Sequence, residues 1–149
     1  MKIRAISGVN SEQSLTPAEK AQVARLAARD REVRAHEAQH LAAAGSLASG
    51  VEYTYQTGPD GKMYAIGGKV RIIADTGGSP EEALANARQI RAAANAPDDP
   101  SAQDMSVAAK AGTMEADALL KVAEQKSASN RSAPGSKPPG SARGFDGTA

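Results

Sequence analysis

An α+β fold is predicted from this sequence: one long helix, a β-hairpin or small antiparallel sheet, and two further helices. Three helix starts are marked by Thr16, Ser79 and Ser101, each a hydroxyl residue followed three positions later by an acid. This capping-box pattern is typical of a helix N-terminus. Between the first two starts, residues 51–66 alternate around a Gly/Pro/Asp turn, as a hairpin requires. At 149 residues the chain fits one small domain.

The first helix is predicted over residues 17–44. Pro17 stands at the first helical position, where its fixed φ favours helix initiation. Apolar residues then recur at helical spacing until Gly45, which is a typical C-terminal stop. The preceding residues 1–14 alternate at their start, and they are expected to form either a short strand or a flexible lead.

The hairpin consists of two predicted strands, residues 51–56 and 63–66, joined by a turn at residues 57–62. Its second strand runs into the double glycine Gly67-Gly68, which predicts a bulge or a sharp bend. Beyond the glycines, residues 69–74 have a strand-forming composition and are able to continue the strand.

Two more helices and a polar tail complete the chain. The second helix is predicted over residues 80–94 and the third over residues 102–125, from their caps and their apolar spacing. From residue 127 onward, Ser, Pro, Gly and Lys dominate without apolar periodicity, so residues 127–149 are predicted to be a disordered tail. The folded domain is therefore expected to span residues 15–126.

Composition argues against several classes of partner. The chain has 18 basic and 17 acidic residues, a net charge of +1 and only 3% aromatic residues, so neither nucleic acid nor a membrane surface is favoured. Cysteine is absent, which excludes disulfides and thiolate metal ligands. The sequence shows no signal peptide and no apolar run of membrane-spanning length. We expect a soluble cytoplasmic protein, and the sequence leaves its oligomeric state open.

Residues 36–40 spell His-Glu-Ala-Gln-His and contain every histidine in the chain. Positions four apart lie one above the other on a helix, so His36 and His40 are able to share one metal ion. Glu37 would then face the open side of that metal and act as the general base of a zinc peptidase. The alternative is a solvated His/Glu face that binds nothing. The use of both histidines within one motif favours the metal site.

A catalytic zinc usually takes a third protein ligand, and without another histidine or any cysteine this ligand must be an acid. Five downstream candidates remain open: Asp60, Asp75, Glu81, Glu82 and Asp104. For Glu82 and Asp104, the residue types and positions alone favour a capping role over a ligand role. The phenols available to stabilise an oxyanion are Tyr53, Tyr55 and Tyr64, and the choice among them depends on strand register.

Three ordered blocks of this sequence resemble the bacterial SprA-related family of proposed zinc metallopeptidases. They are residues 29–40 with the histidine motif, residues 53–68 with the hairpin and double glycine, and residues 97–109. The resemblance implies a zincin-like domain that binds Zn²⁺ and hydrolyses a protein or peptide substrate. It implies His36 and His40 as zinc ligands and Glu37 as the general base. It also makes Asp104 the leading third ligand.

Lys69 departs from the family pattern, because the position after the double glycine is commonly acidic in this family. An acid with a catalytic or ligand role at that position would make this chain an inactive member. Two hypotheses therefore stand. One is a zinc-dependent metallopeptidase, and the other is a non-catalytic interaction module, metal-stabilised or metal-free, with a degenerate histidine motif.

Overall fold

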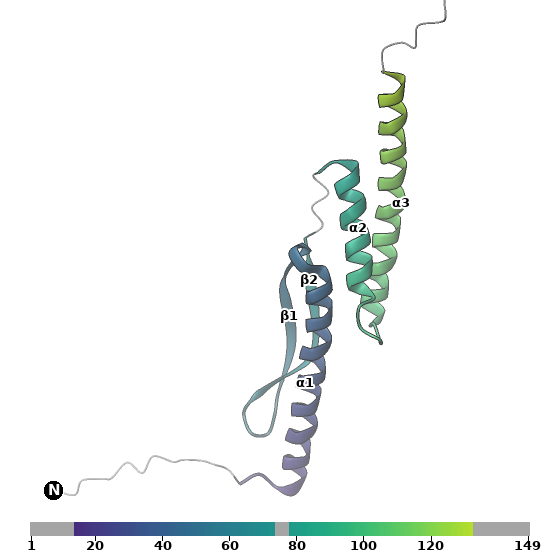
Figure 1. The fold of residues 1–149 in the computed structure, drawn as a ribbon. Coiled ribbons are helices and arrows are strands. Elements are labelled where there is room, and N and C mark those ends of the chain that lie inside the picture. Colours follow the sequence, from purple (N-terminus) through teal and green to yellow (C-terminus); the bar gives the residue numbers. More distant parts are fainter. Residues whose placement is uncertain (1–13, 74–77, 133–149) are drawn as a thin grey trace, which may run out of the picture.

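The computed structural model describes residues 14–73 and 78–132. Within these residues it confirms the α+β class, with three α-helices and a two-stranded antiparallel sheet (Figure 1). In chain order the elements are α1 (Pro17–Ala44), a 3₁₀ turn (Gly45–Leu47), β1 (Ala48–Thr57), β2 (Met63–Ile72), α2 (Pro80–Ala94) and α3 (Ala102–Arg131). Residues 1–13 of the expected lead, the candidate ligand Asp75 and residues 133–149 of the expected tail lie outside the described residues. None of the described helices is long and apolar enough to cross a membrane.

All three predicted helix starts are confirmed by complete capping boxes. In each box the N-cap hydroxyl accepts a hydrogen bond from the N–H three residues later, and the acid at that later position accepts one from the N-cap N–H. The pairs are Thr16 with Glu19, Ser79 with Glu82, and Ser101 with Asp104. Each box satisfies backbone donors that the first turn of a helix leaves without intrahelical partners.

α1 and α2 end where the sequence predicts, whereas α3 ends later. The predicted end at Gln125 was wrong, because α3 continues to Arg131. In the added turn the Ser129 hydroxyl donates to the Gln125 carbonyl at 3.0 Å. Nε of Arg131 donates to the Ser127 carbonyl at 3.3 Å. A polar composition does not by itself stop a helix, and the next helix-breaking residue is Pro134.

The hairpin is confirmed, and both of its strands are longer than predicted. Thr54 pairs with Gly67, and Tyr55 pairs with Ala65, so Ile66 is an extra residue in β2. This is the bulge that the double glycine predicts, and it bends β2 immediately before the two glycines. β2 continues past the two glycines and ends at Ile72.

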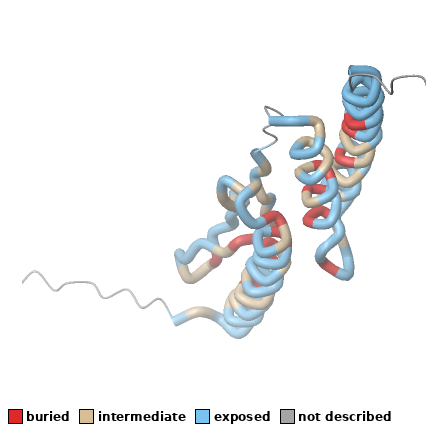
Figure 2. The backbone as a smooth tube through the Cα atoms, turned by 45° about the horizontal axis from the view of Figure 1, so that its top comes forward, coloured by how far each residue is buried: buried red, intermediate tan, exposed pale blue. Residues whose placement is uncertain are grey.

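α1 lies along the hairpin and packs mainly against β2, and its C-terminal part also contacts α2 (Figure 1). α2 and α3 form an antiparallel helical pair. Figure 2 shows the buried residues on the facing sides of these elements. The buried apolar residues are Leu26, Val33, Ala44, Ala65, Ala87, Ile90, Ala93, Ala94, Ala111, Ala118 and Val122. The small alanine side chains allow the helices to approach closely, and this brings the start of α3 beside α1.

Two residues of α1 hold the bulge of β2. Asp30 Oδ1 accepts a hydrogen bond from the Ala65 N–H at 2.8 Å, and Arg29 Nε donates to the Ile66 carbonyl at 3.4 Å. The hydrogen bonds from Arg34 and from Ala65 hold the pKa of the Asp30 carboxyl below its usual value. The bulge is therefore tied to α1, and the glycines that follow it lie against that helix.

Candidate metal centre

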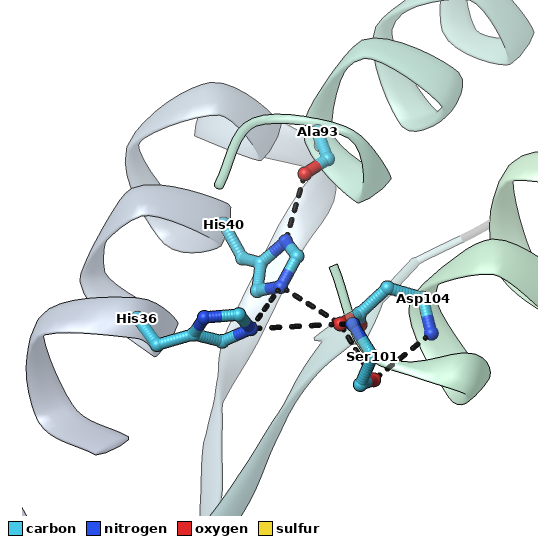
Figure 3. A network of polar contacts seen from close by, with 5 residues as sticks. All are labelled: His36, His40, Ala93, Ser101 and Asp104. Carbon is cyan, nitrogen blue, oxygen red and sulfur yellow. Dashed lines mark hydrogen bonds and ion pairs between the residues drawn. The ribbon is translucent and has the colours of Figure 1, made fainter. Parts of the chain in front are cut away.

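Three side chains from two helices meet at one point (Figure 3). His36 and His40 project from successive turns of α1, and Asp104 projects from the first turn of α3. His40 Nε2 lies 3.2 Å from His36 Nε2 and 3.2 Å from Asp104 Oδ2. His36 Nε2 lies 3.6 Å from the same oxygen. The structure thus brings together the three residues that the resemblance implies as ligands.

A backbone carbonyl orients the ring of His40. Its Nδ1 lies 2.8 Å from the carbonyl oxygen of Ala93, near the end of α2. Because a carbonyl only accepts hydrogen bonds, Nδ1 is the nitrogen that donates here, and Nε2 points toward His36 and Asp104. Such a contact is typical of histidine ligands to metals, since it holds the ring and makes the ligating nitrogen more basic.

The spacing of the three donor atoms fits a tetrahedral zinc site. Ligands bound at about 2.0–2.1 Å to a tetrahedral zinc lie about 3.3–3.4 Å from one another. The three separations here are 3.2, 3.2 and 3.6 Å. A positive charge among these three atoms, carried by a proton or by a metal ion, would stabilise their close approach. Two imidazoles with one carboxylate are also a donor set found in catalytic zinc sites.

Asp104 combines a capping role with its place in the cluster. Its Oδ2 accepts hydrogen bonds from the Ser101 N–H at 2.8 Å and from the Ser101 hydroxyl at 2.6 Å. Burial acts to raise the pKa of the Asp104 carboxyl, but the hydrogen bonds from Ser101 and the proximity of His40 outweigh it, and the pKa lies below its usual value. The capping box therefore keeps this carboxylate ionised and oriented, as a metal ligand requires.

Glu37 lies on the buried side of α1, between the two histidines in sequence. Only 4% of the residue is exposed, and its Oε2 has no hydrogen-bond partner among the described residues. Burial raises the pKa of its carboxyl, although His40 and His36 act in the opposite direction. The side chain lies against Gly68, where an added β-carbon would be 2.7 Å from Glu37 Cγ. A buried carboxyl oxygen without a hydrogen-bond partner is uncommon and calls for an explanation beyond packing.

A cleft of about 350 Å³ opens beside the cluster. It is lined by His36 and Glu37 from α1, Gly68 from β2, and Pro100 and Ser101 from the segment before α3. β2 is the strand that reaches this cleft, and among the described residues it pairs only with β1. His36 and Glu37 of the histidine motif therefore line an open cleft beside the candidate metal site.

The other candidate acids lie elsewhere. Asp60 accepts a hydrogen bond from the Tyr64 hydroxyl at 2.6 Å within the hairpin turn. Glu82 accepts one from the N-cap N–H of α2 at 2.8 Å. Glu81 is exposed at the start of α2. Of the four candidates in the described ranges, Asp104 is the one that meets the histidines.

The tyrosines and Lys69 have roles in the hairpin. Tyr53 and Tyr55 have ring centroids 6.1 Å apart, and the guanidinium carbon of Arg34 lies 5.0 Å from the Tyr53 centroid. The Nζ of Lys69 lies 3.3 Å from Oε2 of Glu52 on the neighbouring strand. Within the described part of the chain, no tyrosine lines the cleft.

Three features of the site escape sequence reasoning. The Ala93 carbonyl is a backbone group, and its contact with His40 leaves no trace in residue types. The cap pattern identifies Ser101 as an N-cap but does not indicate that the same residue orients a ligand. The double glycine predicts the bulge, but the close approach of Glu37 to Gly68 depends on how β2 packs against α1.

The chain belongs to the SprA-related family, whose model matches residues 2–133. This confirms the resemblance drawn from the sequence, and the match extends beyond the three blocks on which that resemblance was based. A search of curated proteins and a search of solved structures each found no significant match. The comparisons therefore supply no activity for the site beyond the family assignment.

Proposed function

We propose that this protein is a zinc-dependent peptidase. His36, His40 and Asp104 would hold the metal, and Glu37 would be the general base. The observation that carries the proposal is the compact triangle of donor atoms, with sides of 3.2, 3.2 and 3.6 Å, next to a buried carboxyl oxygen without a partner. When bound, zinc would supply a Lewis acid that polarises a carbonyl and makes water acidic near neutral pH.

Glu37 would take the proton of the attacking water and return it to the leaving amine. Its Oε2 is unpartnered among the described residues, and its residue lines the same cleft as His36. Burial raises the pKa of this carboxyl, which makes it a stronger base than an exposed glutamate once it is ionised. Gly68 leaves the side chain the room that this position needs.

The cleft supports a peptide substrate. A space of about 350 Å³ accommodates several residues of an extended chain. Within the described ranges β2 pairs with β1 alone, and α1 holds its Ala65 N–H and Ile66 carbonyl. An extended peptide would pair with backbone groups of β2 beyond this bulge. Gly67 and Gly68 lie where β2 enters the cleft, and they present no side chain that would block such a segment.

Metal analysis is the first test of this proposal. We expect one zinc per chain in protein purified without added metal, and loss of that zinc in His36→Ala, His40→Ala and Asp104→Asn. Gln39→Ala is the matched control, because Gln39 is exposed on α1 between the two histidines. A wild-type chain that binds no zinc, or ligand variants that retain it, would contradict the proposed site.

Hydrolysis of a mixed peptide library tests the second half of the proposal. Glu37→Gln should keep the metal and lose at least about a hundredfold in rate, because it removes the base and leaves the ligands in place. Glu124→Gln, at an exposed position of α3, is the control. Zinc binding without any hydrolysis by the wild-type chain would instead support the non-catalytic interaction module.

A further inference from the structure

A second, smaller cavity adjoins the metal centre, and Glu37 is not among the residues that line it. His40 and Asp104 form part of its wall, so this cavity and the proposed metal site share two residues. The rest of the wall is mainly apolar and comes from three elements, β2, α2 and α3. These apolar residues are Val70, Ile72, Ile90, Ala93, Ala94 and Val107. Metal binding by the predicted ligands and proton transfer by the proposed base do not require a cavity at this position.

The size of the cavity limits what fits inside it. Its volume is about 40 Å³, whereas a single water needs about 10–15 Å³ by the same kind of measure. The space therefore suits roughly three non-hydrogen atoms, as in a valine side chain, and it is too small for an aromatic ring. Besides His40 and Asp104, the polar residues of the wall are Lys69 and Gln103, and the six apolar residues that make up the rest of it favour a hydrocarbon group.

β2 connects this cavity to the larger cleft. Gly67 and Gly68 line the cleft, and the following residues Val70 and Ile72 line the cavity. A peptide extended along this strand would therefore pass the cleft, then the metal centre, then the cavity. Successive residues of an extended chain advance by about 3.3 Å. Because the cavity adjoins the metal centre, the side chain that reaches it would belong to a residue next to the bond that is cleaved.

We propose that this cavity is the specificity pocket of the peptidase and that it takes a small aliphatic side chain, of valine size, next to the bond that is cleaved. The inference rests on the proposed peptidase function. Ile90 and Ala93 of α2 and Val107 of α3 line the pocket, and the Ala93 carbonyl orients His40. Bulky substrate residues are excluded because α2 and α3 are packed together beneath it.

Binding to a variant that cannot hydrolyse its ligand tests the pocket directly. The protein is Glu37→Gln with zinc added, and the probes are acetyl-Ala-Ala-Val-Ala-amide and acetyl-Ala-Ala-Phe-Ala-amide. Methyl-labelled NMR titrations follow the signals of Ile72, Ile90 and Val107. The valine peptide should shift these methyl signals and bind at least about tenfold more tightly than the phenylalanine peptide. Equal affinity, or the absence of shifts at these methyls, would overturn the pocket.

Variants of Val107 provide a second test of the pocket. In the same background, Val107→Phe fills the cavity and should abolish the preference for valine. Leu120→Phe is the matched control, because Leu120 is exposed on α3 and lies outside the cavity lining. Val107→Ala enlarges the cavity and should move the preference toward larger side chains, which keeps the test decisive if the filled variant does not fold. A preference that is the same in both Val107 variants contradicts the assignment.

The outcomes separate the pocket from the peptidase function. If the wild-type chain binds no zinc and cleaves no peptide, but the valine peptide still shifts the cavity methyls, the peptidase proposal fails and the pocket stands. If the wild-type chain cleaves peptides without regard to the size of the neighbouring residue, the pocket fails and the peptidase stands. Cleavage beside small aliphatic residues, lost in Val107→Phe and retained in Leu120→Phe, supports both.

Discussion

A β-carbon on Gly68 would lie 2.7 Å from Cγ of Glu37 and 2.9 Å from its Cδ and Oε1. β2 therefore approaches α1 so closely at this point that only glycine leaves room for the glutamate. The bulge at Ile66, which Asp30 and Arg29 tie to α1, brings the strand to this position. The double glycine of the hairpin and the glutamate of the histidine motif are thus parts of one arrangement.

Gly68→Ala should displace the Glu37 carboxyl while leaving the ligands intact. We expect zinc to remain bound, the free energy of unfolding to fall by about 1–3 kcal/mol, and any hydrolysis to fall at least about tenfold. Gly67→Ala is the control, because the nearest atom to its added β-carbon is Thr54 Cβ at 3.9 Å, an ordinary contact. Denaturant unfolding and library hydrolysis measure both effects. Equal behaviour of the two variants would argue against the close packing.

Ser101→Ala should weaken both the start of α3 and the metal site. The hydroxyl accepts from the Asp104 N–H at 3.2 Å and donates to its carboxylate at 2.6 Å. Loss of the cap should cost about 1 kcal/mol of stability, and loss of the contact to the ligand should weaken zinc binding about 10–100-fold. Ser79→Ala removes the equivalent cap of α2 and should leave zinc affinity unchanged. Calorimetric titration with zinc distinguishes the two, and equal zinc affinities would refute the orienting role.

Glu37→Gln should stabilise the metal-free protein at neutral pH. Burial raises the pKa of this carboxyl in the folded state above its ordinary value of 4.5, so the folded state favours the protonated form. The stability that this preference contributes is present below pH 4.5 and is lost as the pH rises through the folded-state pKa. At neutral pH the glutamine variant, which remains neutral, should be more stable by about 1–3 kcal/mol.

The difference between wild type and Glu37→Gln should shrink as the pH falls toward 4.5, because the wild-type carboxyl becomes increasingly protonated in the folded protein. Thermal unfolding in the presence of a chelator, followed by circular dichroism across this range, measures the difference. If the difference in stability between the two proteins did not change with pH, ionisation of Glu37 would not be its cause.

Asp30→Ala should loosen the hairpin from α1. Its carboxylate accepts the Ala65 N–H at 2.8 Å beside the bulge, so without it the Ala65 amide should exchange its hydrogen faster. Asp30→Asn retains an acceptor oxygen and should keep most of the protection. Hydrogen exchange followed by NMR reports on this amide separately from global unfolding. Unchanged exchange in Asp30→Ala would contradict the proposed attachment.

Local sequence patterns account for most of the fold. The capping boxes at Thr16, Ser79 and Ser101 define the helix starts because a cap depends on residues only three positions apart. The bulge beside Gly67 was predictable for a similar reason, since glycine weakens regular strand pairing. The end of α3 was not predictable from polarity, because the chain after Gln125 lacks a helix breaker until Pro134.

The sequence by itself determined that His36 and His40 lie on one face of a capped helix, because their spacing matches one helical turn. It also placed Asp104 in the first turn of another helix, and the family resemblance made it the leading third ligand. Only the tertiary structure decided that Asp104 meets the histidines, that the Ala93 carbonyl orients one of them, and that Glu37 is buried. These relationships depend on how closely α1, β2 and the α2–α3 pair approach one another, and that packing is set by contacts between residues far apart in the chain.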